Sequence, residues 1–287
     1  MAQADRERYL VKLKDCMLDG EVAMHVGALA DDRCKKVSEE RLLLLAKHSE
    51  SQIRLSVSQQ LPFIAQYSPK LASRISVRLL EDADQVILES LAENLHEVAI
   101  HNKDSIRSVA QAIIIKGEQR TICALVEHMP ELLDVDPVSA GFLLARLSEH
   151  EDDVVRYSVA IQIAEIAARD AALAVSVSKS LARKGPTQAI LYMLAHQLPE
   201  LVQANPEDAV FVTEVIATEG DANAMTALVE ELEGASDELA GMDLSGVTGA
   251  FDGRADFAEK ETYAYLKDRL YVAVGNDLPG NQPAFST

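Results

Sequence analysis

Residues 53–69 read IRLSVSQQLPFIAQYSP, and four later stretches of the chain align with this one. In each stretch, apolar residues recur at intervals of three and four, which is typical of a helix that buries one face. Each stretch has one apolar anchor, and successive anchors are 34, 34, 34 and 35 residues apart: Leu61, Leu95, Met129, Ile163 and Leu198. A regular interval of this size predicts stacked helical repeats rather than a single globular core.

A second helix is predicted to begin seven residues after each anchor. The residues there have side chains that accept N–H bonds at a helix start: Ser68, Asn102, Asp136, Asp170 and Asn205. Pro62, Pro130 and Pro199 follow three anchors and should kink or end the first helix of the pair. The pattern predicts antiparallel helix pairs, over residues 52–66, 69–80, 84–100, 103–116, 119–133, 137–148, 152–168, 170–183, 186–203, 206–218 and 221–233.

Residues 69–86 and 152–156 carry a family resemblance. The second stretch, DDVVR, looks like the opening of a HEAT helix, and Arg54 holds the same place as Arg156. The chain thus resembles HEAT and armadillo-type repeats over about residues 38–233. The resemblance implies an all-α fold, a right-handed α-solenoid of antiparallel helix pairs. The family includes scaffolds, transport receptors, lyase subunits and DNA-repair enzymes, so the resemblance implies no single activity.

We expect four segments along the chain. Residues 1–50 should form an N-terminal helical cap, with helices over 5–18, 20–30 and 38–48 that lack the repeat register. Residues 51–233 should form the repeat array. Residues 234–253 are rich in glycine and acids, which predicts a flexible linker. Residues 254–287 should form an amphipathic helix and tail.

The C-terminal segment has an apolar stripe at helical spacing, which includes Phe257, Tyr263, Leu266 and Leu270. An apolar stripe of this kind is expected to be buried against another protein surface. It either folds back and caps the last repeat, or binds a partner or a second copy of the chain.

The net charge and the cysteine content indicate which kinds of partner and which cellular compartment to expect. The net charge of −19 repels phosphate backbones and anionic lipids, so basic protein segments are better partners than nucleic acid or membranes. Cys16, Cys34 and Cys123 fit no disulfide framework. No apolar run reaches about 18 residues and the first residues lack the apolar core of a signal peptide, so we expect a cytoplasmic protein.

No catalytic or metal-binding motif stands out in the sequence. His96 and His101 lie five residues apart rather than the four that place two ligands on one helix face. His128 and His196 occupy nearly equivalent places in two repeats, and we expect both to be solvated. No phosphate-binding loop, nucleophile motif or cysteine pair is present. We therefore expect no enzyme activity, no cofactor and no bound metal.

A repeated set of carboxylates is the strongest candidate for a functional surface. Two residues after four of the anchors stand Glu97, Glu131, Glu165 and Glu200, and Glu93 and Glu127 precede the first two of these by one turn. Equivalent helices of a solenoid pack about 8–10 Å apart, so these charges should reinforce one another. They form either a solvated face or an acidic ridge that binds a partner.

The sequence favours a non-catalytic scaffold or adaptor whose curved face and acidic ridge bind a protein with a basic segment. The alternative is an enzyme or enzyme subunit built on HEAT-like repeats, of the lyase or nucleic-acid-repair kind. A third reading, nucleic-acid binding, needs a basic stripe, of which the sequence gives no sign.

Overall fold

The structure is a computed structural model that describes residues 20–81, 84–103, 105–239 and 242–250. Every regular element in these ranges is a helix. The chain divides into two units, residues 1–143 and 144–287, which are described separately below.

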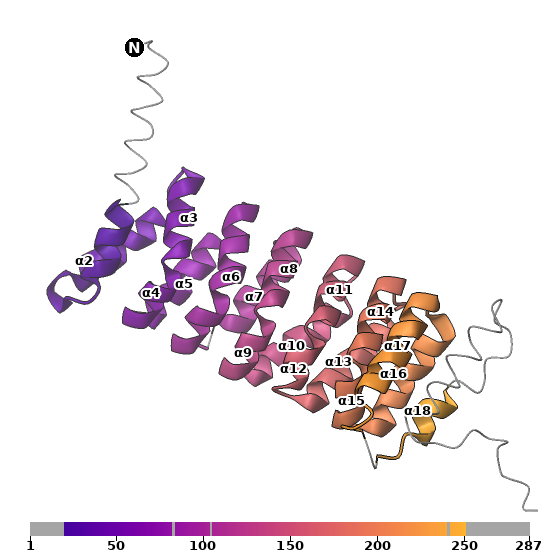
Figure 1. Ribbon diagram of the computed structural model, residues 1–287. Coiled ribbons are helices and arrows are strands. Elements are labelled where there is room, and N and C mark those ends of the chain that lie inside the picture. The colour runs from indigo at the N-terminus through magenta and orange to yellow at the C-terminus, as the bar shows by residue number, and fades with distance from the viewer. Residues whose placement is uncertain (1–19, 82–83, 104, 240–241, 251–287) are drawn as a thin grey trace, which may run out of the picture. The chain divides into compact units, whose positions relative to one another are not determined.

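Unit 1 contains a row of first helices and a row of second helices, which we call the A row and the B row. Its A row consists of α3 (Ser51–Gln59), α4 (Leu61–Tyr67), α6 (Gln85–His101), α8 (Gln119–Glu127) and α9 (Met129–Val135). Its B row consists of α2 (Asp32–Leu45), α5 (Pro69–Leu79), α7 (Ile106–Lys116) and the first half of α10 (Pro137–Ser148). In the A row α3 packs on α6 and α6 packs on α8 (Figure 1).

Unit 2 repeats this arrangement. Its A row consists of α11 (Asp153–Ile161), α12 (Ile163–Ala167), α14 (Gln188–His196), α15 (Leu198–Ala204) and α17 (Ala222–Gly234). Its B row includes α13 (Ala171–Arg183) and α16 (Pro206–Glu219), and α18 (Ser245–Gly249) packs on α16. Each unit is therefore a stack of helix pairs, which is the all-α solenoid arrangement that the resemblance implies.

The five anchors are all buried, and none is more than 5% exposed. Four of them begin the second half of an interrupted A helix, and Pro62, Pro130 and Pro199 each take the second position of that half. Proline therefore ends one helix and fits the first turn of the next, where its missing N–H is not needed. The break before Ile163 has no proline, and α6 runs unbroken through Leu95.

Three of the five predicted helix caps are confirmed by side-chain bonds. Asp136, Asp170 and Asn205 each accept the N–H of the residue three positions later. Ser68 precedes α5, but its hydroxyl donates to Glu39 at 2.7 Å instead. The prediction for Asn102 is wrong, because α7 begins at Ile106 and the Asn102 amide donates to the carbonyl of Pro69.

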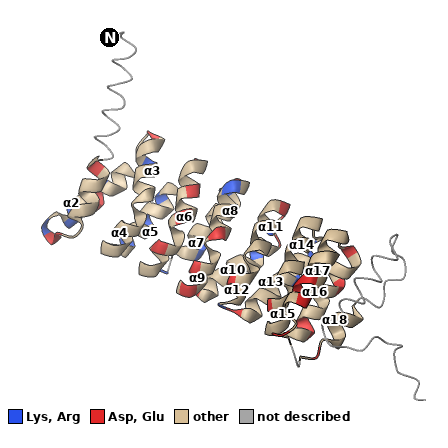
Figure 2. Cartoon of the chain, viewed as in Figure 1, with Lys and Arg blue, Asp and Glu red and all other residues tan. Residues whose placement is uncertain are grey.

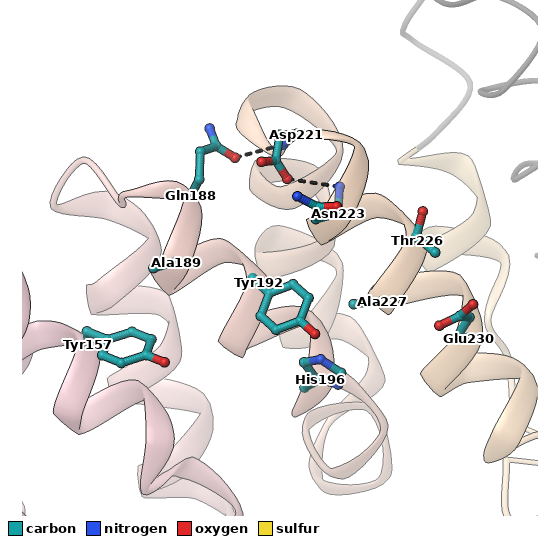
Figure 3. A pocket seen from close by; sticks show the side chains of 10 residues that line it. All are labelled: Tyr157, Gln188, Ala189, Tyr192, His196, Asp221, Asn223, Thr226, Ala227 and Glu230. Atoms are coloured by element: carbon teal, nitrogen blue, oxygen red, sulfur yellow. Dashed lines mark hydrogen bonds between the residues drawn. The ribbon is translucent and has the colours of Figure 1, made fainter.

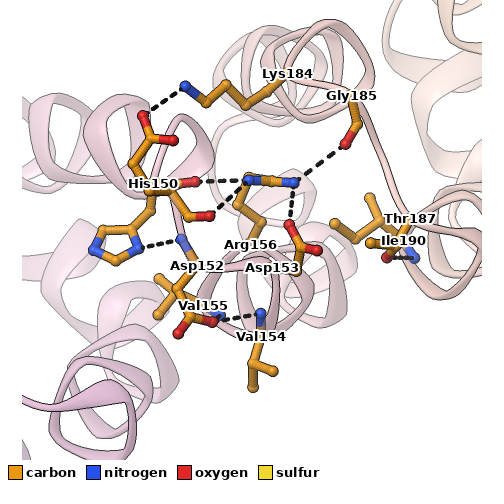
Figure 4. A network of polar contacts seen from close by, with 11 residues as sticks. His150, Asp152, Asp153, Val154, Val155, Arg156, Lys184, Gly185, Thr187 and Ile190 are labelled. Carbon is orange, nitrogen blue, oxygen red and sulfur yellow. Dashed lines mark hydrogen bonds and ion pairs between the residues drawn. The ribbon is translucent and has the colours of Figure 1, made fainter.

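Two arginines fix loops between pairs, the buried Arg156 in unit 2 (Figure 4) and the partly buried Arg54 in unit 1. Arg156 is 4% exposed, and its guanidinium donates to the carbonyl of His150 at 2.8 Å and to that of Gly185 at 3.2 Å. It also pairs with Asp153. In unit 1, Arg54 donates to the carbonyl of His48 at 2.7 Å. In both loops the histidine Nδ1 accepts a backbone N–H two residues later, so the same loop is built twice.

Glutamine and glycine fix the next loop in each unit. The Gln188 amide donates to the carbonyl of Glu219 at 2.8 Å and accepts the N–H of Asp221 at 2.7 Å. Gln85 makes the same two contacts in unit 1. Between the bonded residues lies Gly220, where a Cβ would stand 2.5 Å from the carbonyl oxygen of Ile216. A side chain there would force the loop away from the glutamine.

The two ends of the described chain differ from expectation. α2 begins at Asp32 rather than residue 38 because Asp31 caps it, and it packs on α5 as a second helix of a pair. The expected linker 234–253 begins on the last residue of α17. Its described part includes α18, in which Val247 is fully buried. Apolar residues in that stretch therefore pack on the array, and the other segment boundaries stay predictions.

Candidate functional site

The exposed face of the A row in unit 1 is acidic. Glu93 and Glu97 lie on α6, Glu127 on α8 and Glu131 on α9, and all four are exposed. Because α6 and α8 pack together, carboxylates from neighbouring helices lie on one face. Within the described part of the chain, no lysine or arginine lies within 4.0 Å of any of the four. The four predicted carboxylates of unit 1 therefore have no lysine or arginine partner among the described residues.

A pair of stacked imidazoles lies among these carboxylates. The rings of His96 and His128 have centroids 4.8 Å apart and an angle of 17° between their planes. Glu97 lies 4.0 Å from His96, and Glu131 lies 4.0 Å from His128. His128 is therefore packed against its neighbouring layer, whereas the sequence suggested a solvated ring. His101 is exposed at the end of α6.

In unit 2 the predicted ridge is weaker. Arg169 donates to the carboxylate of Glu165 at 2.7 Å, so Glu165 is already paired. Glu200 on α15 is exposed. Where unit 1 has Glu127, the equivalent residues of α11 and α14 are Ile161 and His196. The six predicted glutamates therefore do not share one environment.

A groove of about 560 Å³ opens on the A row of unit 2, where α11, α14 and α17 line it (Figure 3). Tyr157 and Tyr192 supply two aromatic rings, while Asp221 and Glu230 supply two exposed carboxylates. The remaining lining residues are Gln188, Ala189, His196, Asn223, Thr226 and Ala227. Aromatic faces and carboxylates both attract positive charge, so this chemistry suits a cationic group.

His196 is held in place at this groove. Its Nδ1 lies 2.6 Å from a carboxylate oxygen of Glu231, and Tyr192 packs edge-on against it with ring centroids 4.4 Å apart. This contact was not predicted from the sequence, because Glu231 lies in the next pair and is 35 residues away from His196. A histidine and an acid separated by one repeat length were the only signal.

Two predicted features lie outside the described residues. They are the C-terminal stripe with Phe257, Tyr263, Leu266 and Leu270, and Cys16 near the N-terminus. Cys34, next to Lys35 and Lys36, is exposed. The described ranges contain no group of three or more histidine, cysteine or acidic residues that would hold a metal ion. None of the described helices is both long and apolar enough to cross a bilayer.

Comparison with known proteins adds little to this picture. No family model matches the chain, and no curated protein matches it in sequence. A designed armadillo repeat protein, solved in complex with the peptide (KR)4, is 16% identical to the chain. The match covers 90% of this chain and 99% of that protein, with a TM-score of 0.28. At that TM-score the likeness carries no argument, and the fold rests on the helix contacts described above.

Proposed function

We propose that this protein is a non-catalytic scaffold whose A-row faces hold a basic segment of a partner protein. The observation that carries the proposal is the set of four exposed carboxylates on α6, α8 and α9 that have no lysine or arginine partner within the described residues. Like charges on neighbouring helices that no lysine or arginine neutralises raise the energy of the folded chain. A cationic partner would relieve that repulsion.

The groove of unit 2 supports the same function. Its two tyrosines would contact the side chain of a lysine or arginine, and Glu230 or Asp221 would neutralise its charge. Binding through scattered carboxylates on a rigid stack gives rapid, salt-sensitive association rather than high affinity. This is the expected behaviour of an adaptor that exchanges partners.

The test uses a fluorescent peptide of about ten residues in which lysine alternates with serine. We expect the intact chain to bind it, and the variant with Gln at Glu93, Glu97, Glu127 and Glu131 to bind about tenfold more weakly at low salt. Fluorescence anisotropy at roughly 50 and 150 mM salt measures both affinities, and the difference should shrink as salt screens the charges. Thermal stability should stay equal or rise slightly.

A matched variant controls for net charge. Gln at Glu149, Glu207, Glu214 and Glu219 removes the same charge from exposed positions that lie outside the A-row faces. This variant should bind the peptide within about twofold of the original chain. Equal loss in both variants would mean that overall charge attracts the peptide and that the A row has no binding role.

A further inference from the structure

The B row of unit 1 has the opposite charge to its A row. Among the residues of α5 and α7 there is no acid, while the bases are Lys70, Arg74, Arg78, Arg107 and Lys116. Figure 2 shows these helices with blue and no red. The net charge of −19 hides this segregation, which becomes apparent when charges are counted helix by helix, so no basic stripe was predicted from the sequence.

Three of these five basic side chains already contact other groups of the protein. Arg78 pairs with Glu81, and Lys116 donates to the carbonyl of Leu80 at 2.6 Å. The Arg107 guanidinium stacks on the ring of Phe142 at 3.9 Å. Lys70 and Arg74 are exposed, and within the described ranges neither has an ion pair.

A groove of about 620 Å³ lies beside Arg74, between α2 and α5. Leu43, Leu44 and Val77 give it an apolar lining, and the side chains of Leu44 and Val77 are 60% and 51% exposed. Exposed apolar residues of this size on adjacent helices are a feature of binding grooves. The charged lining residues are Lys47, Arg74 and Glu40, together with Arg78 and Glu81, which pair with each other.

We propose that this groove binds an acidic amphipathic helix of another protein. Apolar side chains on one face of that helix would enter between α2 and α5, where they cover Leu44 and Val77. Carboxylates beside them would pair with Arg74 and Lys47, and Lys70 would extend the attraction along α5. This site is separate from the acidic A row and does not depend on the function proposed above.

An acidic protein helix fits the groove better than nucleic acid does. A phosphate backbone makes no use of apolar residues such as Leu43, Leu44 and Val77, and the strongly acidic chain repels a polyanion of high charge density. A helix with a few carboxylates avoids that repulsion and covers the apolar lining. The groove therefore favours a ligand that has both an apolar face and a few carboxylates.

The experiment uses a labelled peptide of about 16 residues with leucines on one helical face and glutamates flanking them. The probes for comparison are a scrambled peptide of the same composition and a single-stranded oligonucleotide of similar length. We expect the amphipathic peptide to bind the full chain at least about tenfold more tightly than the scrambled one. Anisotropy measures all three, and sedimentation gives the oligomeric state.

Two variants locate the site. The double substitution Lys47→Glu and Arg74→Glu should weaken peptide binding by about tenfold or more. Val77→Asp should have a similar effect, because it places a negative charge in the apolar lining of the groove. All three positions are exposed, and circular dichroism checks that the variants fold. Lys36→Glu, an exposed position on α2 outside the groove, should change binding by less than about twofold.

Other outcomes overturn the proposal. If the scrambled peptide binds equally well, or the groove variants bind like the original chain, no helix occupies the groove. If only the oligonucleotide binds, the basic helices of the B row in unit 1 bind nucleic acid instead of a protein helix. If the peptide does not bind and the groove variants turn a dimer into a monomer, the occupant is a second copy of this chain.

Discussion

Replacing Arg156 by alanine is expected to lower the free energy of unfolding of unit 2 by about 2–4 kcal/mol. The arginine is buried, and its guanidinium binds backbone carbonyls of two loops, at His150 before α11 and at Gly185 before α14. Removing it leaves those carbonyls without their charged donor and leaves a cavity. Urea unfolding followed by circular dichroism measures the change.

Arg120 is the matched control for this prediction. Like Arg156, it lies on an A helix and forms an ion pair, in which its Nε donates to Glu89 of α6 at 2.7 Å, but its side chain is 85% exposed. Arg120→Ala should therefore cost less than about 1 kcal/mol. If both substitutions cost the same, burial and loop contacts give Arg156 no special role. Arg156→Lys should recover only part of the loss, because an ammonium group lacks the planar fork.

Replacing Gly220 by alanine is expected to destabilise unit 2 by about 1–3 kcal/mol. The backbone at Gly220 is extended, so the reason is not a forbidden dihedral angle. The new Cβ would stand 2.5 Å from the carbonyl oxygen of Ile216, and backbone must move to admit it. That movement would separate Asp221 from Gln188, whose bond joins two successive A helices.

Gly234, the last residue of α17, provides the control in the same unit. A Cβ there would meet no atom within 4 Å. Gly234→Ala should therefore leave stability unchanged or raise it by up to about 1 kcal/mol, since alanine restricts the unfolded chain. Thermal unfolding of the two variants side by side checks the prediction. Equal effects would show that the close approach at Gly220 relaxes without cost.

Local signals allowed most helix boundaries to be predicted. The ranges 69–80, 137–148 and 170–183 agree with α5, α10 and α13 to within one residue, because caps and apolar spacing act over a single turn. The break before Ile163 was not predicted, since no proline marks it. The start of α7 was misplaced because Asn102 bonds to the previous pair, and a partner 33 residues away is invisible to local rules.

The candidate sites were harder to predict, because they depend on which residues of different pairs meet. The carboxylates of α6, α8 and α9 could be found, since they repeat at fixed offsets from the anchors. The ion pair between Glu165 and Arg169 and the stacking of His96 on His128 could not be predicted, because both depend on side-chain placement. The basic character of the B-row helices could have been predicted, because the sequences of α5, α7, α10 and α13 contain basic residues and no acids.

The interruptions of the A helices set how fast backbone amides exchange with solvent. The N–H of Gln60 bonds only three residues back, to the carbonyl of Val57, and a new helix begins at Leu61. First-turn amides lack an acceptor four residues back, so local opening costs less there than inside a continuous helix. Deuterium uptake should be faster at the amides of Leu61, Phe63, Leu198 and Glu200 than at the equivalent turn of α6, around Leu95. At this turn, α6 is therefore less prone to local opening than the interrupted A helices.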